Sequence, residues 1–335
     1  MVLADPVLTA NIYCDRGLDA LIHGAITPFR ARLRDSDPGG GWSLWLVRYS
    51  RCGEHLKVRL HGHPERRELA RRLLEESVQA YFAGLPPVSG EVRISRMGAP
   101  PIDVEDDATS DYPDRTLLWT RYRRSHVNLG PPLFLEDDWY TALFTACLGS
   151  GADLVLDFVQ PDQAGKVPGA ARQRGLLRAI FGGLAAVGFS PDERAAYLAY
   201  HRDWLVRFNV AGPEAEAELL ASYDRRAEGM ASTLEQLRQI AGGYWGAAPG
   251  SVTGADADWR DALSALVEYL ARFRGNPEYR LDPFTDDPVF PPLFKAFHAL
   301  ANHLGIGMLD EALVHHLVLR ATATQVAGTG KEAVV

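Results

Sequence analysis

A short segment with strict alternation places the first constraint on the fold of this chain. Residues 55–61 read HLKVRLH, and successive side chains of an extended strand point to opposite faces. One face would carry the aliphatic residues Leu56, Val58 and Leu60. The other would carry the imidazoles and cations of His55, Lys57, Arg59 and His61. The segment therefore predicts a strand with one face in an apolar core. Its basic face is turned either to water or to a site that handles a polar partner.

Further strands are expected around this one in the first 130 residues. Segments 7–14, 42–50, 92–97 and 117–127 are rich in strand-forming residues, and the RCG turn at 51–53 joins 42–50 to 55–62 as a hairpin. Apolar residues at helical spacing predict helices at 18–33 and 64–84, the second between a proline and a glycine.

Helical periodicity dominates after about residue 135. The expected helical segments are 136–149, 171–187, 191–208, 213–241, 255–274, 290–304 and 310–323. Strands followed by helices predict an α+β fold, with a mostly antiparallel N-terminal sheet flanked by helices and a mainly helical C-terminal half sharing one core. We expect a single domain over 1–325, strand-rich in 1–130 and helix-rich in 131–325, with a disordered tail at 326–335.

Composition excludes several classes of protein. A net charge of −8 and a pI near 5.7 argue against a nucleic-acid binder. The sequence has no apolar run long enough to predict a membrane span and no secretory signal at its start. Its three cysteines are far apart and predict neither a disulfide framework nor a metal site. These features predict a cytoplasmic protein.

Searches for cofactor motifs are negative. The sequence contains no phosphate-binding loop, no dinucleotide-binding glycine pattern, no H-E-x-x-H and no G-x-S-x-G. His315 and His316 are adjacent, so on a helix they point about 100° apart and do not chelate together easily. We therefore expect neither a metal nor an organic cofactor.

Two further segments carry candidate functional groups. In 294–307, His298 and Asn302 are helical neighbours at i,i+4, and Gly305 fits a helix C-cap. A histidine on a mostly apolar face is more often a satisfied core residue than a catalytic one. In 121–132, alternating arginines could equally form a charged edge strand.

Three collinear stretches carry a resemblance to a known family. The segment WSLWLVRYSRCGEHLKVRL is similar to the W-x-x-x-R-Y and H-L-R-x-R motifs of lantibiotic dehydratase C-terminal domains. FHALANHLGIG followed by DEALVHHL resembles their terminal H-x-x-x-N-R-L-G and E-E motifs, and YRRSHVNLG falls where they carry E-x-x-R-Y-G-G. The resemblance covers about 10–320. Because the large glutamylation domain does not precede it, the chain is most similar to stand-alone thiopeptide-type biosynthesis proteins.

The resemblance implies roles for individual residues. Arg59 matches the second arginine of H-L-R-x-R, and His298 matches the terminal histidine. The chain departs from the pattern at the first arginine, the glutamate and the middle arginine, which are here Lys57, Ser125 and Asn128. Lysine does not replace the planar fork of an arginine that holds a carboxylate. These departures argue against elimination of glutamate from glutamylated Ser/Thr. They favour a thiopeptide pyridine synthase, which joins two dehydroalanines of a leader-bearing precursor peptide.

Candidate site residues follow from this interpretation. The expected catalytic residues are His298, Arg59, Lys57 and Ser125. The expected peptide-binding residues are His55, Tyr49, Asn128 and Asn302, with Arg67 and Arg71 as a surface for an acidic leader. The proton donor stays open between His298 and the tyrosines Tyr49, Tyr122, Tyr140 and Tyr200.

The function itself stays open between three alternatives. Besides pyridine formation, the chain could be a split dehydratase subunit that eliminates glutamate. It could also be a non-enzymatic subunit that presents the precursor peptide to partner enzymes.

Overall fold

A four-stranded antiparallel sheet forms the N-terminal part of the fold. The structure is a computed structural model that describes residues 7–39, 41–49, 54–87, 114–120, 137–158, 166–246, 253–279 and 282–328. The strands are β1 (Val7–Tyr13), β2 (Ser43–Tyr49), β3 (His55–His61) and β4 (Thr116–Thr120), in the order β2-β3-β1-β4. Strand β2 pairs with β3 as the expected hairpin. The strand expected at 92–97 lies outside the described residues.

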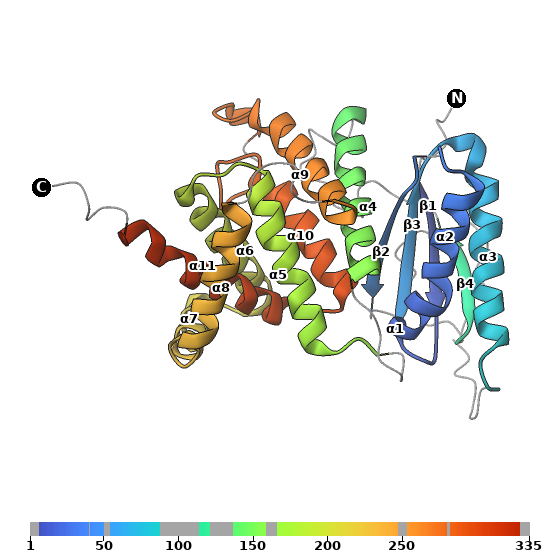
Figure 1. The fold of residues 1–335 in the computed structure, drawn as a ribbon, viewed down its shortest axis with the longest axis horizontal. Coiled ribbons are helices and arrows are strands. Elements are labelled where there is room, and N and C mark those ends of the chain that lie inside the picture. Colours follow the sequence, from blue (N-terminus) through green and yellow to red (C-terminus); the bar gives the residue numbers. More distant parts are fainter. Residues whose placement is uncertain are drawn as a thin grey trace, which may run out of the picture.

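One face of the sheet packs against the N-terminal helices. These are α1 (Leu18–Leu21), a π-helical turn (Ile22–Ile26), α2 (Thr27–Ser36) and α3 (Arg67–Ala83). The aliphatic face of β3 is fully buried here, together with Ile12 of β1 and Leu46 of β2. In Figure 1, α2 and α3 cover the side of the sheet that faces away from the helical half. Burial of this apolar face follows from the alternation of the strands.

The C-terminal half is helical, as expected. Its helices are α4 (Asp138–Phe158), α5 (Gly169–Ala186), α6 (Pro191–Asn209), α7 (Pro213–Glu228), α8 (Ala231–Trp245), α9 (Ala255–Ala271), α10 (Phe290–Leu304) and α11 (Met308–Gly328). The segment expected as one helix at 213–241 is two helices, with a break at Gly229-Met230. Figure 1 shows α4 and α10 next to β2. These two helices place the helical half on the sheet, and the α+β fold class is confirmed.

The free edge of β2 is capped by two side chains of α10. The Leu46 N–H donates to His303 Nε2 at 2.9 Å, and the Arg48 N–H donates to Asn302 Oδ1 at 2.7 Å. The Asn302 amide returns a bond to the Arg48 carbonyl at 3.1 Å. Side chains of α10 thus take the place of a fifth strand on an edge that would otherwise expose its hydrogen-bonding groups.

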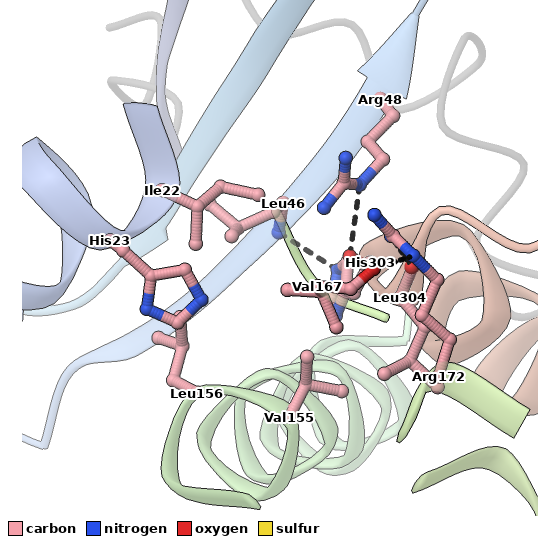
Figure 2. Close-up of a pocket in the computed structure, with 10 residues that line it drawn as sticks. All are labelled: Ile22, His23, Leu46, Arg48, Val155, Leu156, Val167, Arg172, His303 and Leu304. Carbon is pink, nitrogen blue, oxygen red and sulfur yellow. Dashed lines mark hydrogen bonds between the residues drawn. The ribbon is translucent and has the colours of Figure 1, made fainter. Parts of the chain in front are cut away.

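A charged cluster fixes the end of α10 against the same edge. Gly305 ends α10 with φ 70°, the left-handed conformation expected of a C-cap glycine. Arg48 donates to the His303 carbonyl, and Arg172 donates to the Leu304 carbonyl (Figure 2). Both guanidinium groups also bind the Asp19 carboxylate. These contacts hold the sheet and α10 in one fixed relation, which positions the site described below.

Candidate functional site

A cavity of about 370 Å³ lies between the sheet and the helical half. Its lining comes from β2, β3, α4, α6, α10 and the first residue of α11. The lining residues are Trp45, Val47, Tyr49, Lys57, Arg59, Phe144, Leu148, Trp204, Phe208, Phe294, Lys295, His298, Ala299, Asn302 and Met308. The volume falls in the range of small-ligand pockets. The cavity can therefore hold a short reacting segment rather than a whole peptide.

The floor of the cavity is the basic face of β3. Lys57 and Arg59 are almost fully buried, and the Lys57 ammonium lies 4.2 Å from the centre of the Tyr49 ring. Because the pairing places Val47 beside Lys57 and Trp45 beside Arg59, the neighbouring strand supplies apolar walls around each cation. The face predicted from alternation thus points to a cavity rather than to water.

Aromatic side chains form the opposite wall. Trp204 stacks on Phe208 with ring centres 5.3 Å apart, and Phe294 lies 4.5 Å from Trp204. Phe208 is 65% exposed, so the aromatic wall continues to the protein surface. Such a wall offers stacking and apolar contacts to a flat unsaturated group.

His298 connects the cavity to a buried carboxylate. Its Nδ1 lies 2.8 Å from Glu311 Oε2, and the other carboxylate oxygen lies 2.7 Å from His201 Nε2. The chain of contacts ends at the Tyr197 hydroxyl, 3.0 Å from His201 Nδ1. The His298 side chain is 28% exposed, whereas Glu311 and His201 are fully buried. Since Nδ1 contacts Glu311, Nε2 is the ring nitrogen left to act in the cavity.

The carboxylate determines the charge of each imidazole. Burial disfavours the protonated form of His298, but the charge and hydrogen bond of Glu311 outweigh burial and raise the pKa of His298. For His201, burial outweighs the same carboxylate and lowers the pKa. Burial also opposes ionisation of Glu311, but His298 and His201 hold its pKa at about 2. Glu311 thus favours the protonated form of His298, whereas burial favours the neutral form of His201.

Glu311, His201 and His315 are the described residues that come nearest to a metal-ligand set. One ligand atom from each lies within 4.8 Å of the others. The fold brings His201 of α6 beside His315, a neighbour that the spacing of histidines in the sequence does not reveal. The rings of His201 and His315 are stacked at 3.7 Å and 12°, so their nitrogen lone pairs lie in two nearly parallel planes. They do not converge on one ion without turning. The absence of a metal requirement therefore stays a prediction.

Lys295 adds a further cationic group on α10. Burial, opposed in part by the charge of Asp282, lowers the pKa of Lys295 to about 8. The cationic or basic groups in the lining are Lys57, Arg59, Lys295 and His298, and no acidic residue of the described chain lines the cavity. The site thus favours substrates that present oxygen acceptors or develop negative charge.

Comparison with known proteins identifies the family. The profile of the family described as "Lantibiotic biosynthesis dehydratase C-term" matches residues 8–322, which is nearly the whole chain. The chain belongs to this family. No curated protein sequence matches it.

Solved structures with the same fold include members of antibiotic biosynthesis. "Pyridine synthase, TbtD, from thiomuracin biosynthesis" matches with a TM-score of 0.64 and 18% identity, over 97% of this chain and 100% of that chain. TsrL matches with a TM-score of 0.55 and 13% identity, over 96% and 95% of the two chains. The tRNA-dependent lantibiotic dehydratase MibB from Microbispora sp. 107891 matches at 0.48 and 15%, over 98% of this chain and 29% of that chain. The first two likenesses establish a shared fold.

Within this lantibiotic dehydratase C-terminal fold, several of the predicted site residues come together. Tyr49, Lys57, Arg59, His298 and Asn302 all line the one cavity, although Arg59 and His298 are far apart in the sequence. The roles assigned to them stay predictions.

Other predicted residues lie elsewhere. His55 is buried on the same sheet face but stacks on Tyr13 at 4.6 Å, and it is not among the described residues that line the cavity. Ser125, Asn128 and Tyr122 lie outside the described residues.

The predicted leader surface lies across the sheet from the cavity. Arg67 and Arg71 are on α3, the helix that covers the other face of the sheet. Arg71 bonds Glu75 at 3.2 Å, and its guanidinium lies 5.4 Å from the Trp119 ring. This location is compatible with a leader bound outside the reacting cavity, which stays a prediction.

Sequence reasoning missed Glu311, His201 and Lys295. Glu311 occupies the E-E position of the family motif, within the segment DEALVHHL, so a role for it could have been inferred there. Lys295 lies three residues before His298, on the same face of a helix. No local sequence pattern indicates a role for His201, because its contact with Glu311 joins residues 110 positions apart.

The polar floor continues beyond the cavity onto β1. The Asn11 side chain is fully buried next to Lys57, and neither its amide nitrogen nor its amide oxygen has a hydrogen-bond partner among the residues that the structure describes. The Thr9 hydroxyl and the Trp45 indole N–H are likewise buried without a partner. Buried polar groups without partners cost about 1–3 kcal/mol each, so their retention on one face favours a functional role.

Proposed function

We propose that this chain is a thiopeptide pyridine synthase. It would join two dehydroalanines of a leader-bearing precursor peptide in a formal [4+2] cycloaddition and form a pyridine macrocycle with loss of water and the leader peptide. The observation that carries the proposal is the cavity itself. It holds Arg59, Lys57 and His298 together opposite an aromatic wall, in a volume that suits two small unsaturated residues. The fold shared with TbtD and membership of the dehydratase family support it.

Each group has a task in this reaction. Lys57 and Arg59 donate hydrogen bonds to backbone carbonyls of the bound peptide and stabilise charge that develops on their oxygens. The aromatic wall holds the two dehydroalanines against each other, which lowers the entropic part of the barrier. His298, whose protonated form is favoured by Glu311, donates a proton.

The deciding experiment offers the protein a linear peptide with two dehydroalanines and an attached leader. Mass spectrometry should show a pyridine macrocycle and the released leader. Replacement of His298 by Ala should slow ring formation by about 10²–10⁴-fold, as for loss of a general acid. His63→Ala is the matched control, because His63 is exposed and lies away from the cavity. If wild-type protein leaves the peptide unchanged, the proposal is wrong.

Glutamate elimination is the second candidate, and the charge of the cavity favours it. Lys57, Arg59 and Lys295 would attract the carboxylates of a glutamyl group as readily as backbone carbonyls. The same assay with a glutamylated peptide separates the two reactions. Dehydroalanine that appears without ring closure supports elimination.

A non-enzymatic role in peptide presentation is tested by the same variants. In that case substitution of His298 or Arg59 would leave the pathway's product intact. For all three functions, the leader is expected to bind the α3 surface. Charge reversal at Arg67 and Arg71 with unchanged leader affinity would remove that surface from the proposal.

A further inference from the structure

Two of the four lysines of this chain line the cavity. The sequence has 31 arginines and only Lys57, Lys166, Lys295 and Lys331 as lysines. Lys57 and Lys295 face the cavity from β3 and α10. Arginine supplies a permanent charge, whereas lysine can lose its proton when it is buried. Two of only four lysines in one cavity, within a chain that mostly uses arginine, favour a task that needs a transferable proton.

Lys295 and His298 are neighbours whose pKa values are shifted in opposite directions. They are three residues apart on α10, so their side chains lie on the same face of the helix, and both are half-buried in the lining. Burial lowers the pKa of Lys295 to about 8, so about a quarter of its amines are neutral at pH 7.5. The pKa of His298 is raised by Glu311. Burial therefore favours the neutral amine at Lys295, whereas Glu311 favours the protonated imidazole at His298.

The charged groups around the pair support this division. Lys57 and Arg59 line the same cavity from the sheet, so Lys295 shares its lining with two further basic residues. On the other side, Asp282 favours the ammonium form, but its carboxylate also accepts a hydrogen bond from the Tyr200 hydroxyl at 2.8 Å. Glu311 contacts His298.

We propose that Lys295 is the general base and His298 the general acid of a pair that converts one backbone amide of the bound peptide into its iminol. This inference rests on the proposed function, because the cycloaddition needs that tautomer. Lys295 Nζ takes the proton of the amide N–H, and His298 gives a proton to the amide oxygen. The C–N bond becomes double and the C–O bond single, with no oxidation or reduction. Lys295 is left as an ammonium and His298 as a neutral imidazole, and exchange with solvent restores both.

The first test measures Lys295 without any turnover. The protein is labelled with trace acetic anhydride from pH 6 to 10, and the four lysines are quantified by mass spectrometry. Reactivity of Lys295 should reach half its maximum near pH 8. A lysine whose pKa is not shifted would still be gaining reactivity at pH 10. The bis-dehydroalanine peptide should protect Lys295 and leave Lys166, which is exposed and does not line the cavity, unprotected.

The second test measures the role in the reaction. Lys295→Ala should slow macrocycle formation by at least about 100-fold, and added ethylamine should restore part of the rate. Lys295→Arg, which keeps the charge but cannot accept a proton, should be equally slow. The limb of the wild-type pH–rate profile with a pKa near 8 should disappear in both variants. A purely structural role would show neither amine rescue nor loss of this limb.

The outcomes separate the two proposals. If Lys295 labels as an ordinary lysine, or if Lys295→Arg keeps the wild-type rate and pH profile, the acid–base pair is wrong while the proposed function stands. If wild-type protein forms no pyridine, the proposed function fails. In that case, half-maximal labelling of Lys295 near pH 8 together with protection by the peptide would still support Lys295 as a base of this cavity. Labelling with the pH dependence of an unshifted lysine would overturn that assignment.

Discussion

Protonation of His303 should account for a measurable share of the loss of stability in acid. His303 is buried, and its Nε2 accepts the N–H of Leu46 at the free edge of β2. Burial, and then the charge of Arg48, lower the pKa of His303 to about 3 from an unfolded value near 6.5. Between these values the unfolded chain binds the extra proton and the folded chain does not. Stability is therefore complete above pH 6.5 and falls as the pH is lowered.

The magnitude at pH 5 follows from the two pKa values. From 6.5 to 5 is 1.5 units, and at 1.36 kcal/mol per unit the folded state loses about 2 kcal/mol through this one histidine. His303→Gln keeps an oxygen that can accept the Leu46 N–H but removes the titration. The free energy of unfolding should therefore fall by about 2 kcal/mol less in this variant than in wild type between pH 7.5 and 5.

Urea unfolding followed by tryptophan fluorescence at both pH values measures this difference. The comparison uses the change with pH within each protein, so a constant effect of the substitution on packing cancels. His63→Gln, at an exposed position, should behave as wild type. An equal loss of stability in wild type and His303→Gln would refute the assignment of a neutral, hydrogen-bond-accepting His303.

Three further predictions test the charges and polar groups around the cavity. Glu311→Gln should lower the pKa of His298, so the limb of the pH–rate profile that reports the loss of the acid moves to lower pH; an unmoved limb would contradict their coupling. Asn11→Leu should raise the free energy of unfolding by about 1–2 kcal/mol, because it removes a buried amide without partners, and it should reduce peptide affinity measured by calorimetry. Asp19→Asn should lower the melting temperature measured by differential scanning calorimetry, since it leaves the half-buried Arg48 without its counter-charge.

Local patterns predicted most of the architecture because period-2 and period-3.6 alternation report directly on which side is buried. The hairpin of β2 and β3 and the helix that carries His298 follow from such patterns. Patterns do not say which elements meet. The neutral state of His201 and the caps on Leu46 and Arg48 depend on contacts between distant segments.

The same limit explains why His55, which was predicted to bind the peptide, does not line the cavity. Alternation correctly put His55 on the basic face of β3. Its distance from the cavity depends on the pairing of Tyr13 and Tyr49 beside it, which covers the ring from both neighbouring strands. Strand order and register are tertiary properties, so the sequence of β3 alone could not supply them.

The cap on β2 also has a consequence for folding during synthesis on the ribosome, because the strand is made long before the residues that cap it. The Leu46 N–H can donate to His303 only after that residue has been made, 257 residues later. At the usual rate of about 5–20 residues per second, the edge of the hairpin emerges some ten to fifty seconds before its cap. During that interval the nascent hairpin presents an open edge to neighbouring chains on the same messenger RNA. Slower translation should therefore lengthen the exposure to aggregation, and chaperones that hold nascent chains should raise the yield of folded protein without changing its final stability.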